Sequence, residues 1–417
     1  MSVHAGTIIH VGGNNVIDRI QSAGLGDVRV TNDVIREVGN ELIVDKVPQD
    51  PSFTFTLESF DVSAELEAFI TGQHAGTGSA ADPATAAADG TAYKWSDCEF
   101  VNVASPWKDP ATGSAGVVTS GHLVPGFYPT RMRYQFGVSD SASQTVELAG
   151  GAFYYADGAP VEQFATGDAS TTAFVTADAA IPYRIGGAEG SSFKSIFGVI
   201  VGGILQTEGV DYTQSPSNSA SPAVATVTFT TAPANGADIR FCYFTTAAKS
   251  YPQAVHASTV TKPGAVRGRN ICVFLGSGAS RQKLGGVQSF ELEATVEGDF
   301  EREFCNTEVV GYTINGRDCT GSVTVRAKNS DAFLDVLSKV TGVAKTEVIG
   351  WLNQHSLPLE VQIQNPKNPA QVLKTLYVDD AIFQPPGTPA RVNTPTDFQF
   401  GWESRTGDFT VYKGAKP

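Results

Sequence analysis

Two distant stretches of this chain follow one plan, and this repeat constrains the fold more than any other sequence feature. Residues 52–72 read SFTFTLESFDVSAELEAFITG, and residues 322–342 read SVTVRAKNSDAFLDVLSKVTG. They align without a gap at an offset of 322 − 52 = 270 residues. The identical pairs are Ser52/Ser322, Thr54/Thr324, Asp61/Asp331, Thr71/Thr341 and Gly72/Gly342. A duplicated plan predicts two equivalent structural units.

Within each copy, the hydrophobic period changes from that of a strand to that of a helix. Phe53, Phe55 and Leu57 alternate with polar residues, as in a strand with one buried face. A helical stripe follows, formed by Val62, Leu66, Phe69 and Ile70 in the first copy and by Phe333, Val336, Leu337 and Val340 in the second. Gly72 and Gly342 are suited to end these helices, because glycine adopts positive φ readily. Asp61 and Asp331 stand where an acid stabilises a helix start.

Flanking matches extend the repeat. Glu37-Val38 matches Glu308-Val309, and the segment 134–137 matches 398–401. We therefore expect a mainly β chain with two duplicated β-sandwich or barrel domains, each with one short α-helix, at residues 1–154 and 256–417. A small all-β module is inserted between them at 155–255. Turn-forming residues separate the short predicted strands in both copies.

The inserted module has its own pattern. Residues 196–213 and 225–245 each predict a β-hairpin, the second across the turn segment Pro233 to Gly236. This segment resembles a small β module found in bacteriophage tail and fibre proteins, which implies a surface decoration. Residues 73–91, QHAGTGSAADPATAAADGT, predict a long polar loop after the first helix.

Acidic residues alternate along the segment 290–304, FELEATVEGDFEREF. Strand alternation places six carboxylates on one face, namely Glu291, Glu293, Glu297, Asp299, Glu301 and Glu303. The segment is one long strand, or a hairpin that turns near Gly298. The row is either a solvated sheet face that blocks edge-to-edge aggregation, or the hydrated lining of a channel that repels phosphate. The duplication and the acidic balance favour the channel.

Composition excludes several classes of function. The formal net charge of −14 disfavours tight binding to nucleic acid or to an anionic membrane, because both need a cationic surface. The sequence contains no run of about 18 apolar residues, so it predicts no membrane span. The first residues lack a signal-peptide pattern. Five cysteines without a CxxC motif indicate reduced, mostly buried thiols. Whether Cys305 and Cys319 bridge stays open.

The sequence contains none of the common motifs for catalysis or cofactor binding. It contains no P-loop, no HExxH and no DxDxDG loop, and its six histidines are scattered. A glycosidase pair or a calcium site in the acidic row is a weaker interpretation, because a regular row lacks the contrasting environments that set an acid against a base. We therefore expect no enzyme activity, no cofactor and no metal.

Strand-rich domains with one short helix and a long neighbouring loop, duplicated in one chain, resemble bacteriophage tail tube (major tail) proteins. The resemblance implies hexameric rings, or trimeric rings of pseudo-sixfold symmetry when two tube domains are fused, stacked into a tube that conducts DNA during ejection. It implies that residues 290–304 and 26–35 are inner-barrel strands. It further implies that the loop at 73–91 contacts the neighbouring ring, and the candidate residues there are Gln73, His74, Asp82 and Asp89.

The resemblance also implies partners and location. The chain would bind copies of itself, would let double-stranded DNA pass without tight binding, and would meet tail sheath, tape-measure and tail terminator proteins. It would be made in the host cytoplasm and act in the tail of the virion, away from membranes. Two alternatives stay open. One is a tail-tip or fibre-type β protein that binds a host surface, and the other is a hydrolase that uses the acidic row.

Overall fold

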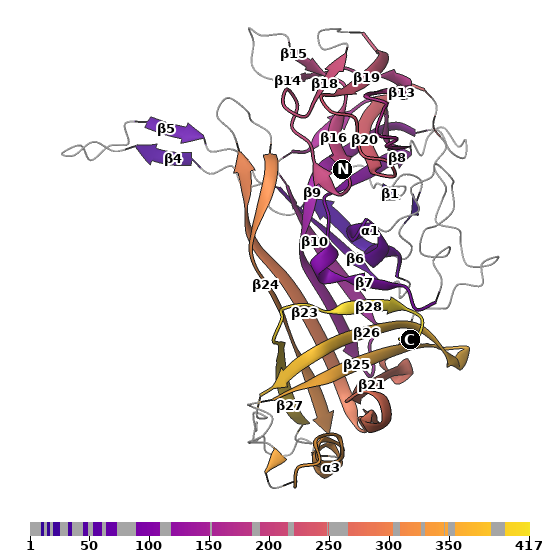
Figure 1. Cartoon of the computed structure of the whole chain (residues 1–417), viewed down its shortest axis with the longest axis vertical. Coiled ribbons are helices and arrows are strands. Elements are labelled where there is room, and N and C mark those ends of the chain that lie inside the picture. Colours follow the sequence, from indigo (N-terminus) through magenta and orange to yellow (C-terminus); the bar gives the residue numbers. More distant parts are fainter. Residues whose placement is uncertain are drawn as a thin grey trace.

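The computed structural model of the chain is mainly β, with two short α-helices among the described residues (Figure 1). The structure describes residues 10–11, 15–16, 20–25, 32–35, 45–48, 53–60, 64–72, 89–108, 118–150, 152–185, 192–215, 221–247, 249, 266–302, 309–326, 330–345, 347–348, 355–384 and 397–417. Long strands run through the body of the molecule, with the inserted module at one end and α3 at the other (Figure 1).

The described residues of the N-terminal half form ten strands and one α-helix. They are β1 (His10–Val11), β2 (Asn15–Val16), β3 (Ile20–Leu25), β4 (Asn32–Ile35), β5 (Asp45–Pro48), β6 (Phe53–Ser59), α1 (Glu65–Ile70), β7 (Ala92–Lys94), β8 (Val101–Lys108), β9 (Val118–Gly137) and β10 (Ser143–Gly150). Strand β11 (Tyr154–Ala156) pairs with β9 at the start of the insert.

In the C-terminal half, the ranges that the structure describes form eight strands and one α-helix. They are β21 (Ile271–Leu275), β22 (Gln282–Lys283), β23 (Val287–Arg302), β24 (Val309–Arg326), α3 (Ser330–Thr341), β25 (Ser356–Asn365), β26 (Asn368–Phe383), β27 (Asp397–Ser404) and β28 (Thr410–Lys413). Short 3-10 turns lie at Trp95–Asp97, Gly268–Asn270 and Gly278–Ser280.

Both halves contain the same path of six hydrogen-bonded strands. In the N-terminal half the path is β1–β8–β9–β10–β6–β3. In the C-terminal half it is β21–β25–β26–β27–β24–β23. Numbered in chain order, each path runs 1-4-5-6-3-2, and the helix follows the third strand in both. β9 then pairs with β23, which joins the two paths into one continuous sheet.

Local predictions for the repeat are confirmed. Phe55 and Leu57 are buried in β6, as Val323 and Val325 are in β24. Gly72 and Gly342 follow the helices with φ of +64° and +72°. The side chains of Asp61 and Asp331 lie outside the described residues.

The anchor match between residues 134–137 and 398–401 is wrong, because it aligns strands at different places in the sheet. Residues 134–137 belong to β9, which lies between β10 and β23. Residues 398–401 belong to β27, which lies beside β24 as β10 lies beside β6. Both segments alternate aromatic and other residues because each strand has one buried face, and not because the two strands occupy equivalent positions in the sheet. The domain boundaries drawn from the repeat stay predictions.

The inserted module has two layers of strands. One layer is β12 (Ala159–Thr166), β20 (Asp238–Thr245), β16 (Phe197–Val201) and β17 (Ile204–Leu205), and the other is β13 (Ala173–Ala180), β19 (Ala223–Phe229) and β18 (Tyr212–Ser215). A small hairpin of β14 (Tyr183–Ile185) and β15 (Ser192–Lys194) lies beside them. The layers meet where Ala180 pairs with both Ala223 and Thr245.

One predicted hairpin of the insert forms and the other does not. β16 and β17 pair as predicted. β19 and β20 do not pair with each other, because the turn between them carries the chain from one layer to the other. Phe229 and Ile239, at the two ends of that turn, are both buried in the core between the layers.

Candidate functional site

The charged face of the large sheet is continuous across the junction of the two halves. Cross-strand register places Glu58, Thr145, Arg133, Glu293, Thr320 and Glu403 in one row on successive strands from β6 to β27. The side chains of this row are polar, and the alternate residues of the same strands are buried. The site is therefore one polar surface formed by both halves, with β9 and β23 at its centre.

The acidic segment is one strand, because β23 runs through Gly298 without a turn. Five of the six predicted acids are described, and Glu291, Glu293, Glu297, Asp299 and Glu301 alternate with more buried residues. The predicted single face is thus confirmed for those five. Glu303 lies outside the described residues.

In the inner part of β23 the acids are paired with arginines of β9 as well as partly exposed to solvent. Arg131 Nη1 lies 3.0 Å from Glu147 Oε1, and its Nη2 lies 2.9 Å from Glu293 Oε2. Arg133 pairs with Glu291, and its Nε lies 3.6 Å from Glu293 Oε2. Hydrogen bonding to Glu293 raises the pKa of Arg131 above its usual value, despite partial burial. The sequence signal was present, because Arg131 and Arg133 alternate with Met132 and Tyr134 at the strand period.

The outer part of β23 has a different environment. Beyond Thr295, the described residues of β23 pair only with β24, as a two-stranded ribbon. Asn315 Nδ2 donates to Asp299 Oδ2 at 3.1 Å, and the Thr313 hydroxyl donates to Glu301. Within the described part of the chain, no ion pair involves Glu297, Asp299 or Glu301. Their negative charge therefore faces solvent.

Aromatic side chains hold this ribbon against the body. Tyr312 stacks on Tyr128 with ring centroids 4.8 Å apart, and Phe300 contacts Tyr312 at 4.9 Å. Tyr128 donates its hydroxyl to the Cys98 carbonyl at 3.1 Å. Burial raises the pKa of Tyr128 and of Tyr312, so both stay neutral at physiological pH. The acids on the opposite face are thereby held away from the core.

The predicted inter-ring loop is described only at its end. Gln73, His74 and Asp82 lie outside the described residues. Asp89 is exposed in a turn just before β7. The C-terminal residues fix this turn, since Gly90 N–H donates to the Lys413 carbonyl at 2.7 Å and β28 pairs with β7. Figure 1 shows these two strands side by side.

A buried polar cluster connects the halves beneath the charged face. Lys374 of β26 is fully buried, and its Nζ lies 2.6 Å from Glu67 Oε1 on α1. The same Nζ donates to Gln144 Oε1 of β10 at 2.9 Å, and the Tyr134 hydroxyl donates to Glu67. Burial and the adjacent Glu67 carboxylate raise the pKa of Tyr134 well above its usual value. Sequence reasoning missed this cluster, because its members are up to 307 residues apart.

A second buried charge fixes the insert to the body. Arg240 of β20 is fully buried, and its Nη2 donates to Glu99 Oε2 at 2.9 Å. Its Nε lies 2.9 Å from Asp238 Oδ2. Burial raises the pKa of Glu99 and of Asp238, and Arg240 opposes that shift. Asn102 adds a contact by donating to Glu162 Oε1 at 3.1 Å.

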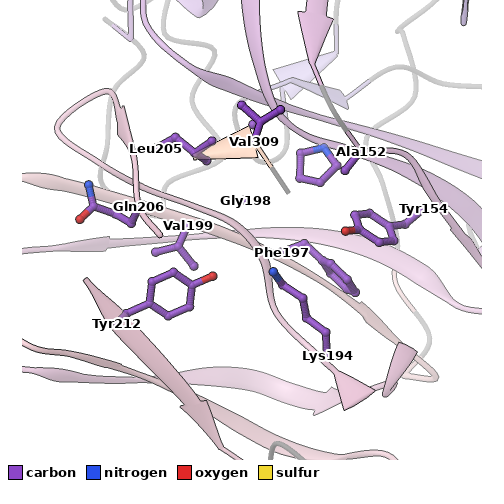
Figure 2. A pocket seen from close by; sticks show the side chains of 12 residues that line it. Ala152, Tyr154, Lys194, Phe197, Gly198, Val199, Leu205, Gln206, Tyr212 and Val309 are labelled. Atoms are coloured by element: carbon purple, nitrogen blue, oxygen red, sulfur yellow. The ribbon is translucent and has the colours of Figure 1, made fainter. Parts of the chain in front are cut away.

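A cavity of about 40 Å³ lies at this junction. Figure 2 shows Tyr154, Lys194, Phe197 and Val309 around it. Lys194 is buried, and its Nζ lies 3.3 Å from Glu208 Oε2. The space suits ordered water and is far below the several hundred Å³ of a typical small-molecule site.

Other site classes find no support in the described residues. No group of three His, Cys, Asp or Glu side chains there could hold a metal ion. None of the helices in the described ranges is long and apolar enough to cross a membrane. Cys98, Cys242, Cys272 and Cys319 are free and buried, and burial raises the thiol pKa of Cys98, Cys242 and Cys319. Cys305 lies outside the described residues.

Comparison with known proteins yields little. No protein-family model and no curated protein matches the chain. One solved structure with partial similarity is described as the cryo-EM structure of the anti-feeding prophage cap (AFP tube terminating cap). It is 13% identical, the match covers 39% of this chain and 99% of that chain, and the TM-score is 0.26. A TM-score this low assigns neither fold nor function to this chain.

Proposed function

We propose that this chain is a structural subunit of a bacteriophage tail tube, which forms stacked rings around a DNA-conducting bore. The observation that carries the proposal is the repeated six-strand path, with the two copies joined where β23, the last strand of the second path, pairs with β9 of the first. A chain that joins two copies of one path in this way can extend the sheet by adding further copies. Closure of such a sheet into a ring removes exposed strand edges, and a heterologous contact between rings then extends a filament.

The charge pattern supports a bore that conducts DNA. The charged face is neutralised near its centre by Arg131 and Arg133, so the sheet can form without strong internal repulsion. The outer acids Glu297, Asp299 and Glu301 keep their negative charge toward solvent. Such a wall repels phosphate and does not grip passing DNA, in contrast to the cationic surface that binds it. In this function the self-contacts are the main interaction, and sheath, tape-measure and terminator proteins of the virion tail are the further partners.

Electron microscopy of the purified full chain tests the assembly. We expect hollow tubes of uniform diameter at high protein concentration or after addition of a tail initiator complex. Monodisperse monomers under both conditions would contradict the proposal.

A charge-reversal experiment tests the bore. The variant E297K/D299K/E301K should still assemble but should retain double-stranded DNA when tubes are sedimented at low salt. The matched control D140K/D157K/E347K makes the same charge change at three exposed acids elsewhere. If both variants retain DNA equally, the acids of β23 do not line the bore.

A second candidate is a fibre-type protein whose insert binds a host surface. Four aliphatic side chains on the insert are 50–66% exposed, namely Val175, Ile204, Val210 and Val224. An open cavity of about 250 Å³ lies beside Val210 and Asp211. Binding of the purified chain to host cells, lost when residues 159–245 are deleted, would favour this candidate. If the purified chain binds no host cell, this candidate is contradicted and the tube remains the proposed function.

A further inference from the structure

The buried cluster of Lys374, Glu67, Gln144 and Tyr134 contains the groups of an amide-forming reaction. A primary amine, a carboxamide and a carboxylic acid meet in one place with almost no exposure to solvent. Lys374 Nζ lies 2.9 Å from Gln144 Oε1 and 2.6 Å from Glu67 Oε1. The residue exposures are 0% for Lys374, 2% for Glu67 and 3% for Gln144. We propose that Lys374 and Gln144 join in an isopeptide bond, with Glu67 transferring the protons.

The position of the amine fits the first requirement, which is a nucleophile within reach of the carbonyl carbon. The hydrogen bond from Nζ to Oε1 brings the amine beside the carboxamide group of Gln144. β-sheet pairing fixes β10 and β26 at either end of this contact, so the groups do not have to find each other. Holding two reactants in this way replaces a bimolecular encounter with an intramolecular one.

Glu67 meets the second requirement, which is a group that moves protons. A buried ammonium–carboxylate pair is costly to keep ionised, and transfer of one proton from Lys374 to Glu67 leaves both groups neutral. The neutral amine is the nucleophilic form. Glu67 Oε1 receives the Lys374 and Tyr134 contacts, whereas its buried Oε2 has no hydrogen-bond partner among the described residues. Oε2 is therefore free to serve the leaving nitrogen.

The atoms balance without a cofactor or an oxidant. The lone pair of Lys374 Nζ forms a bond to Gln144 Cδ, and the bond between Cδ and Nε2 breaks with its electron pair on nitrogen. Nε2 takes one proton from Glu67, and Glu67 recovers one from Nζ, so ammonia leaves. The products are one secondary amide and one ammonia molecule. The surrounding core excludes water, which prevents hydrolysis of the new bond.

The bond would have a mechanical consequence. It links β10 of the N-terminal half to β26 of the C-terminal half across a separation of 230 residues. The two halves would then stay connected even if the hydrogen bonds between β9 and β23 were pulled apart. This inference rests on the cluster alone and does not depend on the tube proposal.

Mass spectrometry of the intact full-length protein tests the proposal. The expected mass is that of the sequence less one ammonia molecule. A tryptic digest should contain residues 134–184 linked to residues 368–391, with no cleavage after Lys374. An intact mass equal to that of the sequence, together with cleavage after Lys374, would overturn the proposal.

Two variants assign the role of Glu67. Glu67→Gln keeps the shape of the side chain and one acceptor oxygen for Lys374 and Tyr134 but cannot transfer the protons, so it should show the full sequence mass and normal cleavage after Lys374. Glu99→Gln is the matched control, because Glu99 is also paired with a buried cation but has no lysine partner; it should retain the loss of ammonia. A folded Glu67→Gln protein that still loses ammonia as fast as the wild type would overturn the role of Glu67.

Discussion

Contacts between a cation and a carboxylate lie on both faces of strand β9, in opposite environments. On the outer face Arg131 and Arg133 meet glutamates with about a third of each side chain exposed. On the inner face Tyr134 lies in the cluster where Lys374 meets Glu67 with almost no exposure. Exposed pairs are adaptable and contribute little, whereas a buried pair is costly to break. The outer face is therefore suited to surface charge and the inner face to connecting the halves.

The largest effect is expected at the inner face. Lys374→Met removes the buried partner of the Glu67 carboxyl group together with the proposed link to Gln144, and we expect a loss of about 3–5 kcal/mol in the free energy of unfolding. Urea unfolding of the variant and the wild type measures this loss. The double variant E67Q/K374M also replaces the buried carboxyl group that would be left without its partner, and it should lose less stability. If Lys374→Met were as stable as the wild type, the buried contacts would contribute no more to stability than the exposed ones, which contradicts this expectation.

At the junction of the insert with the body, the contact of Glu99 with Arg240 makes the stability of the fold depend on pH, and the direction of this dependence can be predicted. Burial raises the pKa of Glu99 above 4.5, so the folded state holds this proton more tightly than the unfolded state. The carboxyl thus contributes stability below its unfolded pKa, and this contribution is lost as pH rises through the folded pKa. Relative to Glu99→Gln, the wild type should therefore become less stable as pH rises from about 4.5. Parallel pH profiles of the two proteins would contradict this expectation.

A smaller effect is expected at the outer face. Arg131→Met removes contacts with both Glu147 and Glu293, and we expect a loss of about 1 kcal/mol that shrinks at high salt. Arg326→Met is the control, because Arg326 is exposed and donates to Gln288 without a carboxylate partner among the described contacts. Equal losses in the two variants, independent of salt, would show that the ion pairs contribute nothing.

The smallest effect on stability is expected on the outer ribbon. E297Q/D299N/E301Q removes three charges that have no cationic partner within the described residues, and the unfolding free energy should change by less than about 0.5 kcal/mol. Thermal or urea unfolding checks this. A large loss would mean that these acids have a structural role and are not simply surface charge.

The sequence predicted what depends on local periodicity. Alternation at Phe53, Phe55 and Leu57 located β6, and Gly72 and Gly342 marked the helix ends, because local spacing and positive φ decide both. It did not predict the partners of β19 and β20, because a turn segment can join strands of one layer or of two. The alignment of 134–137 with 398–401 was wrong for a related reason, since buried faces of different strands share one alternation.

The candidate site was predicted only in part. The acids of β23 share a face, but the arginines that neutralise Glu291 and Glu293 come from β9, and strand pairing decides that contact. The Lys374 cluster depends on contacts across 230 and 307 residues, which no local pattern encodes. The inter-ring role of Gln73, His74, Asp82 and Asp89 stays a prediction.

A cryo-EM reconstruction of assembled protein tests the tube proposal most directly. We expect the polar face with Glu297, Asp299 and Glu301 to line the bore of a hollow tube, with the insert on the outside. A reconstruction that places this face on the outer wall, or an assembly with no bore, would contradict the account.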